Sequence, residues 1–185
     1  LHVRSRRQRQ MCIRDRATTW VELPNLRDAA NYVHPIMETG AEACELLVAP
    51  VMRRSAEHYS HAPESWRNLD EDAAALLVEV GGSDEADLDK AMDRLRTVLA
   101  DAPLLRPLEF LTTAEGMRGA WELRNGLYGL LGADRPNGTA YITEDVCFPP
   151  SQVGEAAADL LDLQAKYGYL SLIHISEPTR RYAIS

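Results

Sequence analysis

The chain has 185 residues, of which 28 are acidic and 20 are lysine or arginine, giving a net charge of -8. The length favours about one folded domain, and no apolar run is long enough to span a bilayer. The acidic balance disfavours binding to the phosphate backbone of nucleic acids.

The two ends of the chain differ from the region between them. Six of the first sixteen residues are arginines, a pattern that fits a nucleic-acid-binding arm, a transit peptide or a basic tail. However, two DNA sequences that look like the adapters of transposase-based sequencing libraries translate, each in one continuous frame, to residues 6–16 and 170–180. We therefore expect Leu1–Arg16 and Leu170–Ser185 to be adapter-derived and disordered, and we exclude both from the interpretation of the fold.

The region between the ends, Ala17–Tyr169, is more acidic than the whole chain. Removing eight arginines and two acidic residues leaves 12 basic and 26 acidic residues, so its net charge is 12 − 26 = -14. If the arginine-rich tail were genuine, salt-dependent DNA binding would be its sign. Cys44 and Cys147 have no metal-like spacing and favour a reducing compartment. We expect the cytoplasm, with a peripheral position at the inner face of the membrane as the alternative.

Strand and helix patterns alternate along the first half of this region. Asn25 is a predicted helix cap, Pro35 should kink or restart the helix, and Gly40 should end it. In chain order, the predicted elements are a strand at 18–24, a helix from Leu26, a strand at 43–50, a short helix at 50–58, a strand at 73–82, and a helix capped by Ser83 that buries Leu88, Met92, Leu95, Val98 and Leu99.

The second half continues the alternation. The predicted elements are a strand at 104–112, with Pro107 at an edge or bulge, a helix at 113–131, a turn at 132–138, a strand at 139–149 and a helix capped by Ser151. These patterns predict an α+β fold with ferredoxin-like halves, a mostly antiparallel sheet and helices on one face.

Arg124 is the first candidate for chemistry. It stands three residues after Trp121, so the two side chains share one face of the predicted helix. An arginine held by a tryptophan can bind a carboxylate in bidentate fashion. The alternative is a surface arginine whose stem packs on the aromatic ring.

Other polar residues favour structural roles. Glu144 and Asp145 are neighbours at a predicted strand end, so they point to opposite faces and do not form a carboxylate dyad. His58 and His61 have a spacing that metal can use, but no third ligand is evident. Cys147 lies between apolar residues and is typical of a core position.

The residues from Trp121 to Tyr169 resemble the C-terminal cap domain of FAD-linked oxidases, which include D-lactate, glycolate and D-2-hydroxyglutarate dehydrogenase-like flavoproteins. Upstream, the stretches "ELP" and "AALLVEVGG" also look like the opening strands of this domain. The residues that carry the resemblance are Trp121, Arg124, Glu144, Asp145, Val146, Pro149 and Lys166-Tyr167-Gly168-Tyr169.

The resemblance implies a parent enzyme that oxidises a small D-2-hydroxy acid to the 2-keto acid and passes electrons to an acceptor. Arg124 would bind the substrate carboxylate and Asp145 would support the pocket. Where some members have a substrate-binding lysine, this chain has Thr143. FAD would be bound mainly by an upstream domain of the same chain. Downstream parts would supply histidines that serve as ligands of a divalent metal or as the catalytic base. In some members they would also carry an iron–sulfur cluster.

The resemblance also implies that the present chain alone is inactive. The alternative hypothesis is a non-catalytic ferredoxin-like module that binds a small ligand or a protein. An in-frame flavin domain upstream favours the first hypothesis, and a natural start codon near Ala17 favours the second.

Overall fold

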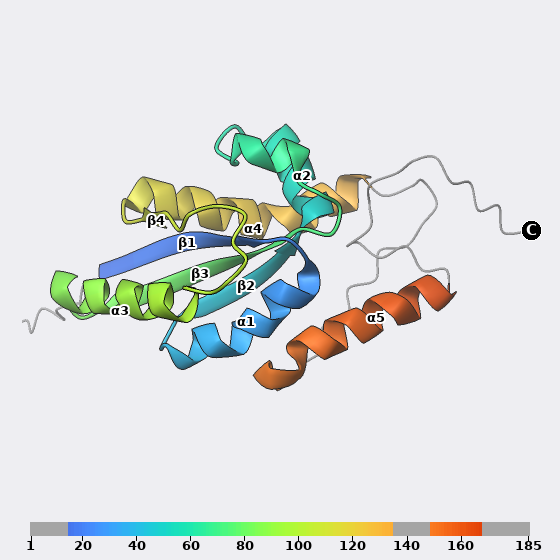
Figure 1. Cartoon of the computed structure of the whole chain (residues 1–185). Coiled ribbons are helices and arrows are strands. Elements are labelled where there is room, and N and C mark those ends of the chain that lie inside the picture. The colour runs from blue at the N-terminus through green and yellow to red at the C-terminus, as the bar shows by residue number, and fades with distance from the viewer. Residues whose placement is uncertain (1–14, 135–148, 168–185) are drawn as a thin grey trace, which may run out of the picture.

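A computed structural model describes residues 15–134 and 149–167 (Figure 1). The elements in chain order are β1 (Asp15–Leu23), α1 (Leu26–Glu38), β2 (Ala43–Val48), α2 (Ala49–His58), the 3-10 helix η1 (Glu64–Asn68), β3 (Ala74–Gly82), α3 (Glu85–Val98), β4 (Phe110–Leu111), α4 (Ala114–Asp134), the 3-10 helix η2 (Pro150–Gln152) and α5 (Val153–Tyr167).

The sheet is antiparallel, with the strand order β2-β3-β1-β4. The chain order β1-α1-β2-β3-α3-β4 is that of a ferredoxin-like unit, with α2 and η1 inserted between β2 and β3. This topology confirms the predicted α+β class, the ferredoxin-like arrangement and the antiparallel pairing.

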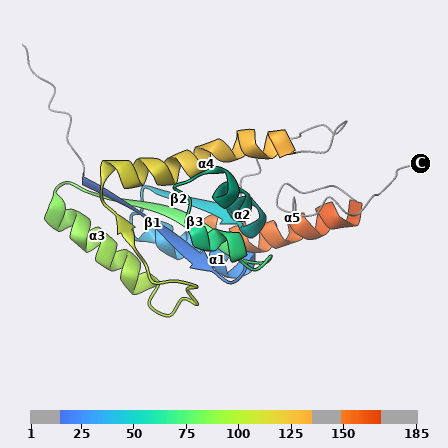
Figure 2. The ribbon, with the colours of Figure 1, turned by 90° about the horizontal axis from the view of Figure 1, so that it is seen from above.

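Helices cover both faces of this sheet (Figure 2). We call the side under α1 and α3 the first face, and the side under α2, η1 and α4 the second face. Side chains alternate between the two, so Leu76 and Val78 of β3 pack on the first face while Leu77 packs on the second. The sequence analysis placed helices on one face only. The five apolar residues of β3 from Ala74 to Val78 indicate a strand buried on both sides, and this signal predicts a second helix layer.

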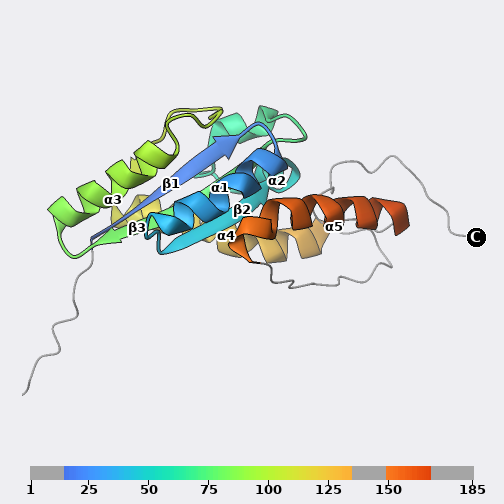
Figure 3. The same cartoon turned by 60° about the horizontal axis from the view of Figure 1, so that its bottom comes forward.

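The two helices of the first face lie side by side over the sheet, and α5 lies alongside α1 (Figure 3). The Asn25 side chain accepts a hydrogen bond from the Asp28 amide, which confirms the predicted cap of α1. The helix runs through Pro35 without a restart and ends before Gly40, whose φ is +87°. Pro35 removes the amide partner of the Asn31 carbonyl, and Asn31 is exposed, so water can take that place.

Several predicted boundaries shift. Asp84, not Ser83, caps α3, because its carboxylate accepts from the Asp87 amide while Ser83 binds the Asp87 side chain. The strand predicted at 104–112 shortens to β4, since Pro107 has no N–H for a ladder. Ser151 lies in η2, before α5 begins. The strand predicted at 139–149 falls almost wholly outside the described residues.

The first strand starts earlier than the expected domain boundary. Asp15 and Arg16 pair with Gly82 and Gly81 of β3, so the ladder includes two residues of the leading segment that we assigned to adapter. The origin of the two ends stays a prediction.

Candidate functional site

Helix α4 lies across the second face and carries the predicted site residues. The Thr113 hydroxyl accepts a hydrogen bond from the Gly116 amide and so closes the first turn. Ala120 and Leu123 are buried against the sheet, and their burial fixes the rotation of the helix. Trp121 and Arg124 therefore flank a buried stripe, and both reach carboxylates on the strands beneath.

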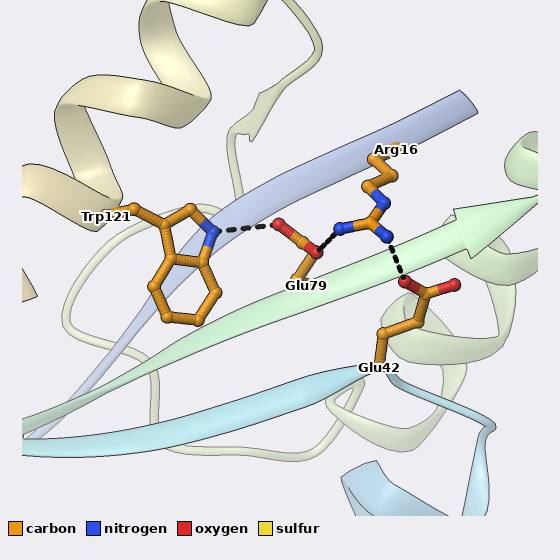
Figure 4. A network of polar contacts seen from close by, with 4 residues as sticks. All are labelled: Arg16, Glu42, Glu79 and Trp121. Carbon is orange, nitrogen blue, oxygen red and sulfur yellow. Dashed lines mark hydrogen bonds and ion pairs between the residues drawn. The ribbon is translucent and has the colours of Figure 1, made fainter. Parts of the chain in front are cut away.

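Trp121 is anchored to a buried carboxylate. Its indole Nε1–H donates to Oε2 of Glu79 at 2.8 Å, and Arg16 donates to Oε1 of the same carboxylate at 2.7 Å (Figure 4). Arg16 also contacts Glu42 at 3.3 Å. Glu79 is 7% exposed, so both of its oxygens are bound where water hardly reaches.

Arg124 forms an ion pair with the neighbouring strand. Its Nη2 donates to Oε2 of Glu45 at 2.9 Å. The two side chains are 42% and 36% exposed, so this pair lies at the surface. A guanidinium has five N–H donors, and one contact with Glu45 leaves others for a ligand.

The two carboxylates match the spacing of the helix. Glu45 pairs with Leu77 and Glu79 pairs with Ala43, so the glutamates are diagonal neighbours on one sheet face. Such diagonals are about 7–8 Å apart, and residues three apart on a helix surface are about 5–6 Å apart, so two long side chains of one helix can reach both glutamates. The expectation that Trp121 and Arg124 share a helix face agrees with these contacts.

Asp145, the other predicted site residue, and Glu144 lie outside the described residues, as does Cys147. The substrate-binding roles of Arg124 and Asp145 therefore stay predictions. What the structure adds is that the Arg124 guanidinium already has a carboxylate partner, Glu45.

A second buried carboxylate, that of Glu22, was not predicted from the sequence. Glu22 of β1 is 4% exposed, accepts from the Trp66 indole at 2.8 Å, and lies 3.3 Å from Nε of Arg106. Glu22 and Glu79 thus each accept from an indole N–H and lie beside a guanidinium, but Arg16 donates a hydrogen bond to Glu79, whereas Oε2 of Glu22 has only the ion-pair contact with Arg106 and no hydrogen-bond partner. A glutamate inside an otherwise apolar strand run is the signal that could have identified both residues.

The other candidates have local partners. His34 lies 3.6 Å from Glu38 within α1, and the His58 ring lies 3.3 Å from the Arg54 carbonyl oxygen. His61 stacks at a tilt on Tyr59. Across residues 15–134 and 149–167, no three His, Cys, Asp or Glu side chains gather as a metal site would require.

Cys44 is half-buried on the first face. Burial, with a smaller contribution from the adjacent Glu45 charge, raises the pKa of its thiol from 9.0 to about 12. The thiol is therefore protonated at neutral pH and is a poor nucleophile.

An open groove of about 670 Å³ between α1 and α3 is lined by both acids and bases, including Glu38, Asp93, Lys90 and Arg94. Nothing in this mixed lining resembles a cradle of backbone amides for a pyrophosphate. Within the same described ranges, no helix combines the length and the apolarity needed to cross a membrane.

Comparison with known proteins gives the family. The sequence profile described as "FAD linked oxidases, C-terminal domain" matches residues 13–177. No curated protein matches the chain. The profile covers most of the 185 residues, including all of the ferredoxin-like unit and α4. The chain therefore belongs to the family of C-terminal domains of FAD-linked oxidases.

Proposed function

We propose that this domain is the substrate-binding part of an FAD-dependent oxidoreductase that converts a small D-2-hydroxy acid to the 2-keto acid. The family implies an oxidoreductase parent that uses FAD. In this proposal another domain of the parent holds the flavin, which accepts the hydride when bound. The present domain contributes the group that holds the acid end of the substrate.

The proposal rests on the contacts and the exposure of the Arg124 side chain. Its Nη2 donates a hydrogen bond to Glu45, and its side chain is 42% exposed. The helix that bears it is anchored three residues earlier by the bond between Trp121 and Glu79. An accessible guanidinium on an anchored helix is suited to orienting a carboxylate, because less conformational freedom is lost when the ligand binds.

The role of Arg124 in the reaction is binding and orientation. A carboxylate that approaches the open side of the guanidinium accepts charge-assisted hydrogen bonds from N–H groups that Glu45 does not use. That contact places the 2-carbon of the substrate at a fixed distance from the arginine. Asp145, which lies outside the described residues, is proposed to support the binding of the same carboxylate.

The test requires the parent oxidase that contains this chain, purified with its flavin. Anaerobic bleaching of the flavin absorbance is followed with D-lactate, glycolate, D-2-hydroxyglutarate and the L-isomers. We expect bleaching by at least one D-2-hydroxy acid or glycolate. Arg124→Gln should lower kcat/KM by about 100-fold, as the loss of a charge-assisted carboxylate contact implies.

Arg118 provides the matched control, since it is exposed on the same helix six residues earlier. Arg118→Gln removes the same charge and should change kcat/KM by less than about twofold. Equal effects of the two substitutions would show that only net charge matters and would overturn the assignment of Arg124. A parent without flavin would favour a non-catalytic ligand-binding module.

A further inference from the structure

Arg124 lies among carboxylates. Glu45 contacts its Nη2 at 2.9 Å, and Glu79 is the diagonal neighbour of Glu45 on the same face. Glu79 binds Arg16, which also contacts Glu42 (Figure 4). These groups are three carboxylates and two guanidiniums, with a net charge of -1 before any ligand arrives. A neutral residue in place of Arg16 would make the cluster more negative.

A ligand carboxylate on Arg124 would share the guanidinium with Glu45. The contact between the first carboxylate and the arginine offsets the repulsion from Glu45. A second carboxylate on the same ligand has no such contact with Arg124 and feels the repulsion alone. Unit charges a few ångströms apart in a solvent-exposed site change an equilibrium by about fivefold or more.

We propose that Glu45 is a specificity-determining residue that makes the Arg124 site prefer 2-hydroxy monocarboxylates over 2-hydroxy dicarboxylates. This inference rests on the carboxylate-binding role proposed above for Arg124. The diagnostic quantity is the ratio of the two affinities. Without Glu45 the guanidinium loses a support, which weakens the binding of both ligands alike and cancels in that ratio. The loss of the Glu45 charge does not cancel, because it favours binding of the dicarboxylate.

The experiment uses the whole 185-residue chain, labelled with ¹⁵N. D-lactate and D-2-hydroxyglutarate are titrated at constant pH and ionic strength, and dissociation constants are taken from amide shifts in β2 and α4. The variants are Glu45→Gln, Glu45→Asp and Arg124→Gln. Glu122→Gln is the matched control, because Glu122 is an exposed glutamate two residues from Arg124. Tryptophan emission checks that each variant is folded.

We expect the chain to bind D-lactate about fivefold more tightly than D-2-hydroxyglutarate. Glu45→Gln should reduce this preference by about threefold to fivefold, while Glu45→Asp and Glu122→Gln change it by less than about twofold. Arg124→Gln should abolish both titrations.

The other outcomes separate the two proposals. If Arg124→Gln leaves binding unchanged, the carboxylate site is elsewhere and the proposed function of Arg124 fails. If Arg124→Gln abolishes binding but Glu45→Gln and Glu122→Gln shift the ratio equally, only the role of Glu45 is wrong. If neither ligand binds at up to 100-fold molar excess over the protein, the inference about Glu45 is overturned. Turnover by the parent enzyme then still decides the role of Arg124.

Discussion

The two faces of the sheet are built differently. On the first face, β1 and β3 present Ala17, Val21, Leu76 and Val78 to two amphipathic helices. On the second face, the same two strands present Glu22 and Glu79, each bound to a tryptophan of the covering layer. One sheet thus carries an apolar core on one side and a core interrupted by carboxylates on the other.

The difference separates two ways of holding a helix. Apolar contacts are non-directional, so the position of α1 and α3 depends on how their side chains fill volume. A buried carboxylate must meet its donors at hydrogen-bond distance, and a helix shifted by one turn would leave it unsatisfied. The second face therefore specifies the position of α4, and with it the place of Arg124, more strictly than apolar packing could.

The largest expected effect is on the first face. Leu95→Ala removes a fully buried side chain of α3 and should lower the free energy of unfolding by about 2–5 kcal/mol, because it leaves a cavity. Urea denaturation followed by tryptophan emission measures the loss. Leu105→Ala is the control, since Leu105 is 44% exposed and its truncation should cost less than about 0.5 kcal/mol. A loss below about 1 kcal/mol at Leu95 would mean that this face is not a packed core.

The second prediction concerns the tryptophans that hold the carboxylates. Trp66→Phe and Trp121→Phe keep an aromatic ring but remove the donor to Glu22 or Glu79, and each should cost about 1–3 kcal/mol. Trp20→Phe is the matched control, because Trp20 packs edge-on against Trp66 at a centroid distance of 4.8 Å without an indole hydrogen bond to described residues.

Chemical denaturation followed by far-ultraviolet circular dichroism compares the three variants without relying on their altered fluorescence. Equal losses at all three positions would show that ring volume, and not the hydrogen bond to a carboxylate, is what stabilises the second face.

The sequence predicted the parts of this architecture that depend on neighbouring residues. The Asn25 cap lies three residues from its partner Asp28, and the shared face of Trp121 and Arg124 follows from helix geometry. The partners of Trp121 and Arg124 come from strands 42 and 79 residues away. Their identity depends on strand register and on which face α4 covers, and neither is encoded in a local pattern.

The helix layer on the second face was not predicted because it depends on such distant contacts. Helices α1 and α3 follow strands as a ferredoxin-like unit requires, so periodicity suffices to predict the first layer. The second layer requires knowing that β3 is buried on both sides. Its run from Ala74 to Val80 contains that information, with Glu79 as the one charged residue, because a charged residue inside such a run needs a partner from a covering element.

The third prediction concerns Cys44 of β2. Its thiol lies on the first face of the sheet, and the side chain of the adjacent Glu45 lies on the second face. The pKa of the thiol is raised from 9.0 to about 12 in the folded state, so the unfolded chain loses this proton first. The contribution of the neutral thiol to stability is complete below pH 9.0 and is lost as the pH rises from 9.0 towards 12. At pH 10.5 we expect a loss of about 1–2 kcal/mol relative to pH 8.

Urea midpoints of the native chain and of Cys44→Ala at both pH values measure this loss. The substitution should remove the part of the pH dependence that belongs to the thiol, while the titration of tyrosines and lysines affects both proteins. Parallel pH profiles for the two proteins would show that Cys44 is not shielded from water by the first-face core.

The smallest expected effect is at the exposed end of the second face. Arg124→Gln and Glu45→Gln should each change the free energy of unfolding by less than about 1 kcal/mol, because ion pairs this exposed are weakened by solvent and salt. A double-mutant cycle in urea gives their coupling, which we expect at about 0.2–1 kcal/mol. A coupling near zero would mean that Glu45 does not fix the guanidinium in solution. A coupling above about 2 kcal/mol would mean that the pair is a structural bond, and a ligand carboxylate would then have to compete with it. A weak but measurable coupling is the condition under which Arg124 is both held in place and available to a substrate.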